Sequence, residues 1–192
     1  MSSIESLDLK LDSIPKRLKD LTLPNRVIGE LSLRSIRKNF RVGGRPKKWK
    51  PSRRKLTGHK TLINTTALMR SISARPEKDK LTIGTNKIYA PLMHYGGTVR
   101  AKNAKFLTIP IGLTPLQMRQ GLRARDFKNT FIAKSRFSSL IIFQKEAGGV
   151  KPLFLLKPSV RIVPRPFLML QKRDKNEFSA IYLNYILGEF HK

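Results

Sequence analysis

Residues 81–99 read LTIGTNKIYAPLMHYGGTV, and the rest of the chain is organised around this stretch. Apolar residues alternate at its start, at Leu81 and Ile83, which predicts a strand that turns at residues 84–86. The short apolar segment that follows predicts one helical turn, ended by the two glycines at 96–97. The stretch contains no enzyme motif. It therefore predicts a structural unit, and we interpret His94 within it as a packing residue.

Composition sets the broad class of the protein. The chain has 192 residues, of which 40% are hydrophobic, and this length suits one domain with its own core. It has no cysteine, so disulfides and thiolate metal sites are excluded. The amino terminus lacks the pattern of a signal peptide. The longest apolar runs, Leu140–Phe143 and Leu153–Leu156, are far too short to span a membrane. We expect a soluble protein.

The charge is large and unevenly distributed. Forty Lys and Arg face twelve Asp and Glu, which gives a net charge of +28. No acidic residue occurs between Leu31 and Pro76, although basic residues are frequent there. Such an excess favours contact with a polyanion or with an acidic protein surface. The alternative to such a contact is a basic face that meets only solvent. The basic residues at the start of the acid-free stretch are Arg34, Arg37, Lys38 and Arg41.

The first part of the chain is predicted to be helical. Residues 1–13 are polar and are expected to be peripheral. Apolar residues then recur with helical spacing from Ile14 to Phe40, with Pro24 between them. Proline is tolerated in a first turn, so the pattern predicts either helices at 14–22 and 24–40 or one kinked helix. The glycines at 43–44 would end it.

Residues 41–60 are predicted to form a basic loop, because Gly, Pro and Ser interrupt any periodicity. Trp49, the only tryptophan, either anchors this loop to the core or stacks on a base. A second basic loop follows Gly97. The candidate polyanion or partner contacts in the two loops are Arg45, Lys47, Lys48, Lys50, Arg53, Arg54, Lys55, Arg100, Lys102 and Lys105.

The remaining patterns alternate short helices with strands. Residues 65–71 predict a short helix capped by Thr65 or Thr66, and a hairpin follows with strands at 71–75 and 80–84. Farther on, Thr114 and Pro115 predict another short helix that ends near residue 122. Strands are predicted at 106–109, 130–134, 140–145, 150–156 and 159–163.

The chain is predicted to end in an amphipathic helix. Asp174 and Glu177 have the spacing of a capping box, which predicts a helix from there to about residue 190. Its apolar face would pack on the sheet or form a subunit interface. That candidate interface comprises Phe178, Ile181, Tyr182, Tyr185 and Ile186.

Together these elements predict one α+β domain over residues 1–192. We expect a mostly antiparallel sheet, an N-terminal helix or helix pair, short helices in the middle and a C-terminal helix. Residues 119–149 are interpreted as an insertion with a hairpin.

Recognisable catalytic chemistry is missing from the sequence. It contains no phosphate-binding loop, dinucleotide fingerprint, nucleophile elbow or zinc-protease motif. His59, His94 and His191 lie far apart and have no metal-ligand partner at short spacing. Glu77 and Asp79 form a close carboxylate pair, but a turn containing proline favours solvated side chains. We therefore expect no enzyme, no metal and no cofactor.

Four segments resemble the phage virion morphogenesis (tail completion) family. The Gly43–Lys50 loop is similar to its Gly/Pro–Trp loop. Leu62–Ile72 is similar to its leucine, threonine–glycine, leucine, arginine, serine–isoleucine segment, with Ala67 where glycine is usual. Residues 81–96 resemble its isoleucine–glycine–threonine–asparagine segment. Pro164–Leu168 resembles its proline–arginine–proline–phenylalanine–leucine turn. The resemblance implies an α+β protomer without catalytic residues that closes into a ring, commonly sixfold.

Two functional hypotheses follow. In the first, the resemblance implies a structural virion protein at the head–tail junction, assembled in the host cytoplasm. It would form a homo-oligomeric ring in contact with other tail and neck proteins, and its basic surface would face either DNA in the channel or acidic neighbours. In the second, the protein is a non-catalytic DNA- or RNA-binding protein that uses its basic loops.

Overall fold

The computed structural model describes residues 13–52, 60–63, 65–135 and 138–189. The chain is organised as two compact units. Unit 1 comprises residues 1–96 and 163–192, and unit 2 comprises residues 97–162. The prediction of one domain stays a prediction. The segment interpreted as an insertion, 119–149, lies wholly within unit 2.

Unit 1 is built around one long helix, α2. The elements of this unit are α2 (Thr22–Val42), α3 (Ala67–Arg70), β1 (Ile72–Pro76), β2 (Leu81–Thr85), α4 (Ala90–Tyr95) and α6 (Lys172–Leu187). Residues 13–18 are also helical. The predicted helix pair is therefore present, although its first member is shorter than expected. The peripheral segment predicted at residues 1–13 lies almost entirely outside the described residues.

Local chemistry fixes both ends of α2. At the start, the Asp20 carboxylate accepts a hydrogen bond from the backbone N–H of Thr22 at 3.0 Å. Pro24 sits in the first turn, where a missing N–H costs nothing. At the other end, Gly43 adopts a left-handed conformation with φ 76°, and the N–H of Gly44 bonds to the carbonyl of Asn39. The two glycines end the helix as predicted.

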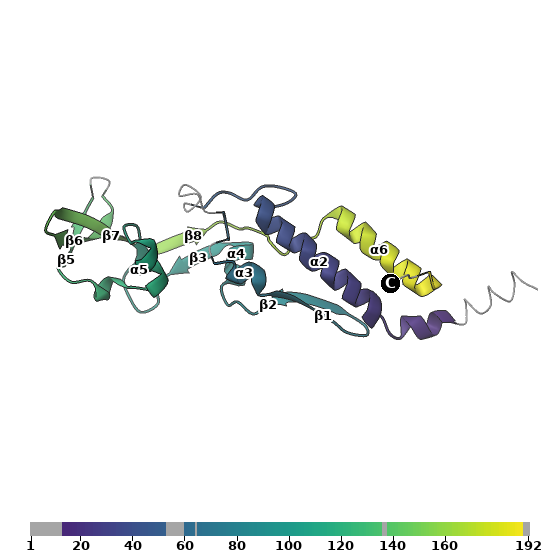
Figure 1. Ribbon diagram of the computed structural model, residues 1–192. Helices are drawn as coiled ribbons and strands as arrows, with labels where there is room; N and C mark the ends of the chain where they lie inside the picture. The colour runs from purple at the N-terminus through teal and green to yellow at the C-terminus, as the bar shows by residue number, and fades with distance from the viewer. Residues whose placement is uncertain (1–12, 53–59, 64, 136–137, 190–192) are drawn as a thin grey trace, which may run out of the picture. The chain divides into compact units, whose positions relative to one another are not determined.

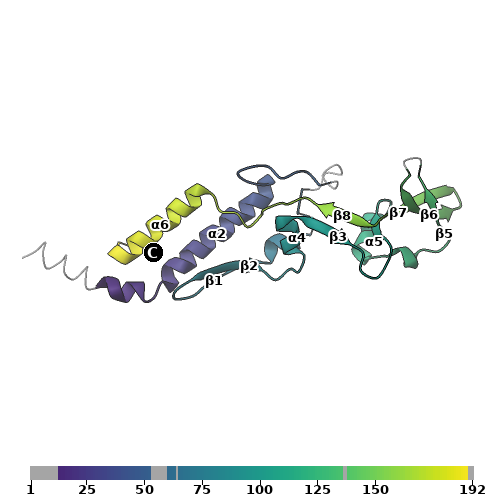
Figure 2. The same cartoon turned by 180° about the vertical axis from the view of Figure 1, so that it is seen from behind.

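The helix α2 packs between a hairpin and α6 (Figures 1 and 2). Strands β1 and β2 pair antiparallel, with Ile72 opposite Thr85 and Pro76 opposite Leu81. Gly29 allows the helix to approach this hairpin closely, because a Cβ there would lie 3.2 Å from the Cβ of Ala74. The hairpin and the helical turn α4 confirm the organisation predicted for residues 81–96.

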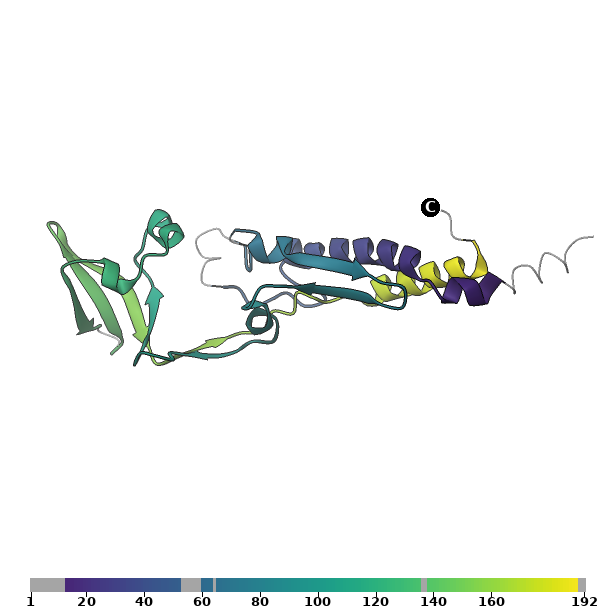
Figure 3. The same cartoon turned by 90° about the horizontal axis from the view of Figure 1, so that it is seen from below.

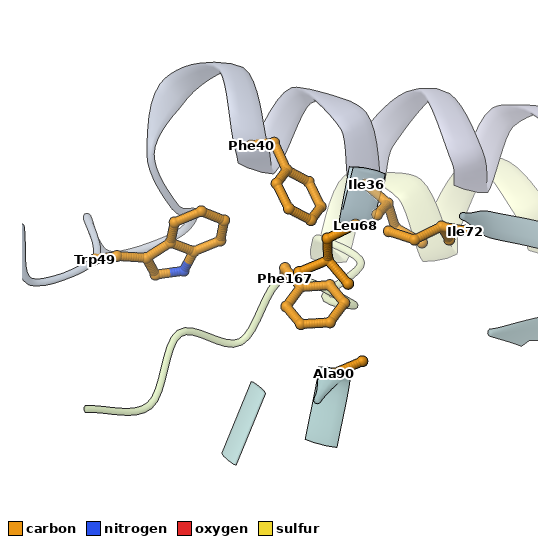
Figure 4. Close-up of a cluster of buried hydrophobic side chains, with 7 residues drawn as sticks. All are labelled: Ile36, Phe40, Trp49, Leu68, Ile72, Ala90 and Phe167. Carbon is orange, nitrogen blue, oxygen red and sulfur yellow. The ribbon is translucent and has the colours of Figure 1, made fainter. Parts of the chain in front are cut away.

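The core of unit 1 gathers aromatic side chains from distant parts of the chain (Figure 4). Phe40 and Phe167 are fully buried, with ring centroids 5.3 Å apart. Trp49 packs edge-on against Phe40 at 5.8 Å and is only 8% exposed, so it anchors the loop rather than presenting its ring to a base. Burying each such side chain stabilises the fold by about 1.5–3 kcal/mol.

Unit 2 is formed by antiparallel strands and short helices. Its elements are β3 (Gly97–Arg100), β4 (Leu107–Pro110), α5 (Pro115–Gln120), a 3₁₀ turn (Ala124–Asp126), β5 (Thr130–Lys134), β6 (Leu140–Glu146), β7 (Gly149–Lys157) and β8 (Ser159–Ile162). Strands β3 and β8 pair with each other, and the other strands form a sheet in the order β4–β7–β6–β5. Figure 3 shows the strands of unit 2 in green from below.

The core of unit 2 is formed mainly by side chains of β6 and β7. Leu153 and Phe154 are buried there with Ile142 and Leu156, and Phe127 packs edge-on against Phe154. The short helix predicted from Thr114 is present as α5, and Thr114 caps it, because its hydroxyl accepts from the N–H of Gln117 at 3.3 Å. The fold class is therefore α+β with antiparallel pairing, as predicted.

Three local predictions need correction. The first residues of the second basic loop are part of β3, which pairs with β8, so Arg100 belongs to a strand. Thr66 precedes α3 with φ 58° and makes no capping bond with its side chain. The helix α6 begins three residues earlier than expected, because Asp174 reaches back to accept the N–H of Gln171 at 2.8 Å. Asp174 thus acts at the third helical position.

Candidate partner-binding surface

Arg45, the first of the predicted contact residues, makes hydrogen bonds within unit 1. Its Nε donates to the side-chain oxygen of Asn39 at 2.7 Å, and one terminal nitrogen donates to both the carbonyl and the hydroxyl of Ser35. These bonds tie the start of the basic loop to α2. Arg45 is half-buried and is a structural cation, so its guanidinium is poorly placed to bind a partner.

The lysines that follow differ from one another. Lys47 is exposed, and no partner for its ammonium group occurs among the residues the structure describes. Lys48 donates to the carbonyl of Val42 at 2.6 Å, which satisfies a group at the end of α2. Lys50 is exposed, and its backbone carbonyl accepts from Nε of Arg165. Three further candidates lie outside the described residues: Arg53, Arg54 and Lys55.

The outer face of α2 carries a row of arginines that was not among the candidate site residues. Arg34, Arg37 and Arg41 are exposed and lie about 4.5 and 6 Å apart along the axis, from a rise of about 1.5 Å per residue. With Glu30 and Leu33 they line a surface pocket of about 330 Å³. The helical spacing of these cations in the acid-free stretch was the signal that could have identified them.

The second group of predicted contacts belongs to unit 2. Arg100, Lys102 and Lys105 are exposed. The ammonium group of Lys105 lies 5.8 Å from the centre of the Phe106 ring, a weak cation–π contact. The two predicted loops thus contribute to different units of the chain.

The apolar face of α6 is partly occupied within unit 1. All five predicted interface residues are half-buried, and α6 packs against α2. The Tyr182 hydroxyl donates to the side-chain oxygen of Asn25, and the Tyr185 hydroxyl donates to the carbonyl of Asp20. Burial raises the pKa of Tyr182 above its usual value of 10.0. A subunit contact through this face stays a prediction. The more exposed apolar residues of α6 are Leu183 and Leu187.

Glu77 is held in surface ion pairs, with Arg75 at 3.3 Å and Lys80 at 3.1 Å. Within the described ranges, no cluster of three or more His, Asp or Glu side chains could hold a metal ion. These pairs are consistent with the turn role given to this carboxylate.

His94 packs as expected from the sequence. Its ring meets that of Phe167 edge-on at 5.1 Å, and its Nδ1 accepts a hydrogen bond from the N–H of Leu168 at 3.4 Å. Burial lowers the pKa of His94 below its usual value of 6.5. The imidazole therefore favours its neutral form at neutral pH and joins α4 to the segment before α6.

The described part of the chain has no helix that is both long and apolar enough to cross a membrane. The described residues expose many cations and several large apolar side chains, which are suited to contacts with other macromolecules.

The chain belongs to the phage virion morphogenesis family, whose model matches residues 2–116. The resemblance drawn from the sequence is thereby confirmed. The turn at Pro164–Leu168 lies outside the matched range.

A relative from Haemophilus influenzae (strain ATCC 51907 / DSM 11121 / KW20 / Rd) has the name Mu-like prophage FluMu G protein 2. It is 34% identical over 76 residues, which cover 40% of this chain and 51% of the relative. The match thus spans about half the length of that relative. No solved structure matches the chain.

Proposed function

We propose that this protein is a non-catalytic structural component of a tailed phage or phage-like particle, which completes the tail at the head–tail junction. It would form a ring, commonly sixfold, that joins the tail tube to the head. The family match over residues 2–116 is the observation that carries this proposal. The prophage relative agrees with a role in virion morphogenesis.

The basic surface supports work by contact with other macromolecules. Arg34, Arg37 and Arg41 make no ion pair within the described residues, and Glu30 is the one carboxylate that lines their pocket. Like charges at this spacing destabilise a helix by about 0.2–0.5 kcal/mol per pair. An acidic neighbour in the virion, or DNA passing through the ring, would offset that repulsion. Arginine suits both partners because its planar group can donate two parallel bonds to carboxylate or phosphate.

Electron microscopy and sedimentation of the purified protein test the ring. Closed rings, or decoration of tail ends by the added protein, are the expected results. Particles assembled without the protein should have unjoined heads and tails, and added protein should restore joining. A chain that neither forms rings nor associates with tails would contradict the proposal.

The alternative is a free DNA- or RNA-binding protein, favoured by the same row of arginines. It predicts tight duplex binding with a logarithmic salt slope of about 0.9 for each neutralised phosphate. Replacing Arg34, Arg37 and Arg41 by Gln should then lower the slope by up to about 2.7. The matched control replaces Lys172, Arg173 and Lys175, three exposed cations of α6, by Gln. Equal slopes for both variants would exclude the α2 face as the DNA contact.

A further inference from the structure

The strand β5 lies at one edge of the four-stranded sheet, beside β6. No other strand pairs with its outer side among the residues that the structure describes. Its sequence, TFIAK, contains neither proline nor glycine and carries a single charge, at Lys134. Charges, prolines and bulges protect edges of this kind from further strands, and the single charge of β5 is at its last residue.

The hydrogen bonds at both ends of β5 show which of its backbone groups point outward. The N–H of Lys145 donates to the carbonyl of Asn129 at 3.0 Å, and the N–H of Ser135 donates to the carbonyl of Ser139 at 2.8 Å. Bonded residues alternate along an antiparallel pair, so odd-numbered residues of β5 bond to β6. The outward backbone groups belong to Thr130, Ile132 and Lys134.

The opposite edge, β4, is protected. The N–H of Ile111 donates to the carbonyl of Leu153 at 2.9 Å, so the outward positions of β4 are Thr108 and Pro110. Proline has no N–H, and its presence at an outward position blocks strand addition. The two edges of the sheet therefore differ, and only β5 offers a continuous row of donors and acceptors.

Apolar side chains also favour the addition of a further strand at the β5 edge. Ile132 is 61% exposed, although it lies opposite Ile142, which is buried in the core of unit 2. Phe131 is on the other face of the sheet, stacked on Phe143 with ring centroids 5.7 Å apart. An added strand would continue both apolar rows and would cover Ile132.

We propose that β5 pairs antiparallel with β5 of a second copy of this chain, about a two-fold axis through Ile132. The three outward residues are symmetric about Ile132, so it faces its own copy while Thr130 faces Lys134 of the other chain. This register forms about six backbone hydrogen bonds. The result is one continuous eight-stranded sheet.

The sequence of β5 suits pairing with itself. The two lysines lie opposite threonines, so the repulsion of like charges directly opposite one another is avoided. The two Ile132 side chains meet across the axis, and Phe131 comes beside the small Ala133 of the other copy. Two-fold contacts of one patch with itself are the commonest form of protein assembly. Such a contact stands apart from the head-to-tail contacts that a closed ring requires.

Cysteine cross-linking tests the register directly, since the natural chain has no cysteine. In the full-length Ile132→Cys variant the paired Cα atoms would lie about 5.5 Å apart, within disulfide range. Lys134→Cys is the matched control, because two copies would hold that position about 13 Å apart. We expect oxidation to give a covalent dimer for position 132 at least about ten times faster than for position 134. A mixture of Thr130→Cys and Lys134→Cys chains should cross-link as a heterodimer. Equal rates at 132 and 134 would overturn the register.

Sedimentation equilibrium tests the interface itself, at about 0.3–0.5 M salt to screen the repulsion between two highly charged chains. The wild-type chain should associate through this two-fold contact, and Ile132→Lys should raise the dissociation constant of that step at least about tenfold. Ile132→Pro should do the same, because it removes an outward donor and leaves the bonds to β6 intact.

Leu116→Lys is the control, at a leucine of α5 that is 64% exposed. It should leave the dimer unchanged, and circular dichroism of each variant verifies the fold. A wild-type chain that stays monomeric at about 100 μM would overturn the proposal. So would a dimer that both substitutions of Ile132 leave intact. Electron microscopy reports ring formation separately: rings that form without the β5 contact would leave the tail-completion role intact, whereas a chain that stays monomeric would count against the ring as well.

Discussion

Arg45 donates from its Nε to the side-chain oxygen of Asn39 at 2.7 Å, and the amide group of Asn39 donates to the carbonyls of Phe167 and Met169. Asn39 is fully buried. One side chain thus joins the end of α2, the basic loop and the segment that leads to α6. The amide nitrogen has two carbonyl acceptors, whereas the bond from Arg45 is the one that the amide oxygen accepts, so loss of Arg45 leaves a buried oxygen unpaired.

Replacing Arg45 by Ala should therefore lower the free energy of unfolding by about 1.5–3 kcal/mol, the range for hydrogen bonds to charged groups. Lys47→Ala removes the same formal charge from an exposed side chain and should change stability by less than about 0.5 kcal/mol. Urea denaturation of both variants checks this. Equal losses would mean that the charge of the loop matters and the hydrogen bonds of Arg45 do not.

Stability should fall in mild acid because of His94. Its pKa is lowered by burial, so the unfolded chain binds the proton more readily than the folded chain. The contribution is complete above about pH 6.5 and is lost as the pH falls through the folded-state pKa. Protonation of Nδ1 would also remove the acceptor for the N–H of Leu168.

His94→Gln should flatten this part of the profile, as measured by urea unfolding at intervals between pH 7.5 and 5. The variant keeps His59 and His191, so their contributions occur in both proteins and cancel in the comparison. A variant with the same acid dependence as the wild type would show that His94 is not the group responsible.

Gly112 should not tolerate a side chain. A Cβ at this position would lie 1.8 Å from the backbone carbonyl oxygen of Pro152, so alanine requires the backbone to move. We expect Gly112→Ala to destabilise the protein by at least about 1–3 kcal/mol. Gly148→Ala in the β6–β7 turn is the control, because a Cβ there meets nothing within 4 Å. Thermal unfolding followed by circular dichroism would reveal the difference.

Asn25 and Tyr182 should be energetically coupled. The Asn25 amide donates to the carbonyls of Glu77 and Lys80, and its oxygen accepts from the Tyr182 hydroxyl. A double-mutant cycle with Asn25→Ala and Tyr182→Phe should give a coupling energy of about 0.5–1.5 kcal/mol. Strict additivity of the two losses in urea unfolding would show that the bond contributes nothing.

Much of the fold could be predicted because its signals are local. The glycines at 43–44 end α2, Thr114 caps α5, and short apolar runs mark β5, β6 and β7. Arg100 was misassigned to a loop because β3 exists only through its pairing with β8, about 60 residues away in sequence. A four-residue strand carries too little periodicity to be detected without its partner.

The candidate surface was predicted only in part. The sequence located the basic region, but not which cations remain available to a partner. Arg45 and Lys48 bond to α2, whereas Arg34, Arg37 and Arg41 point to solvent along its outer face. This distinction depends on which backbone groups come within reach of each side chain after folding, and spacing along the chain does not contain it.

The sequence by itself determined the family, the antiparallel α+β class and the large positive charge. These follow from short-range patterns and from composition, which are independent of distant contacts. Only the tertiary structure decided which edge of the sheet is open. Pro110 and Ile132 are both apolar residues in short strands. Pairing of β4 with β7 directs Pro110, which has no N–H, to the outer side of that edge, whereas pairing of β5 with β6 leaves the backbone donor and acceptor of Ile132 pointing outward. The direction of a backbone N–H is set by the partner strand, and that partner is chosen only when the chain folds.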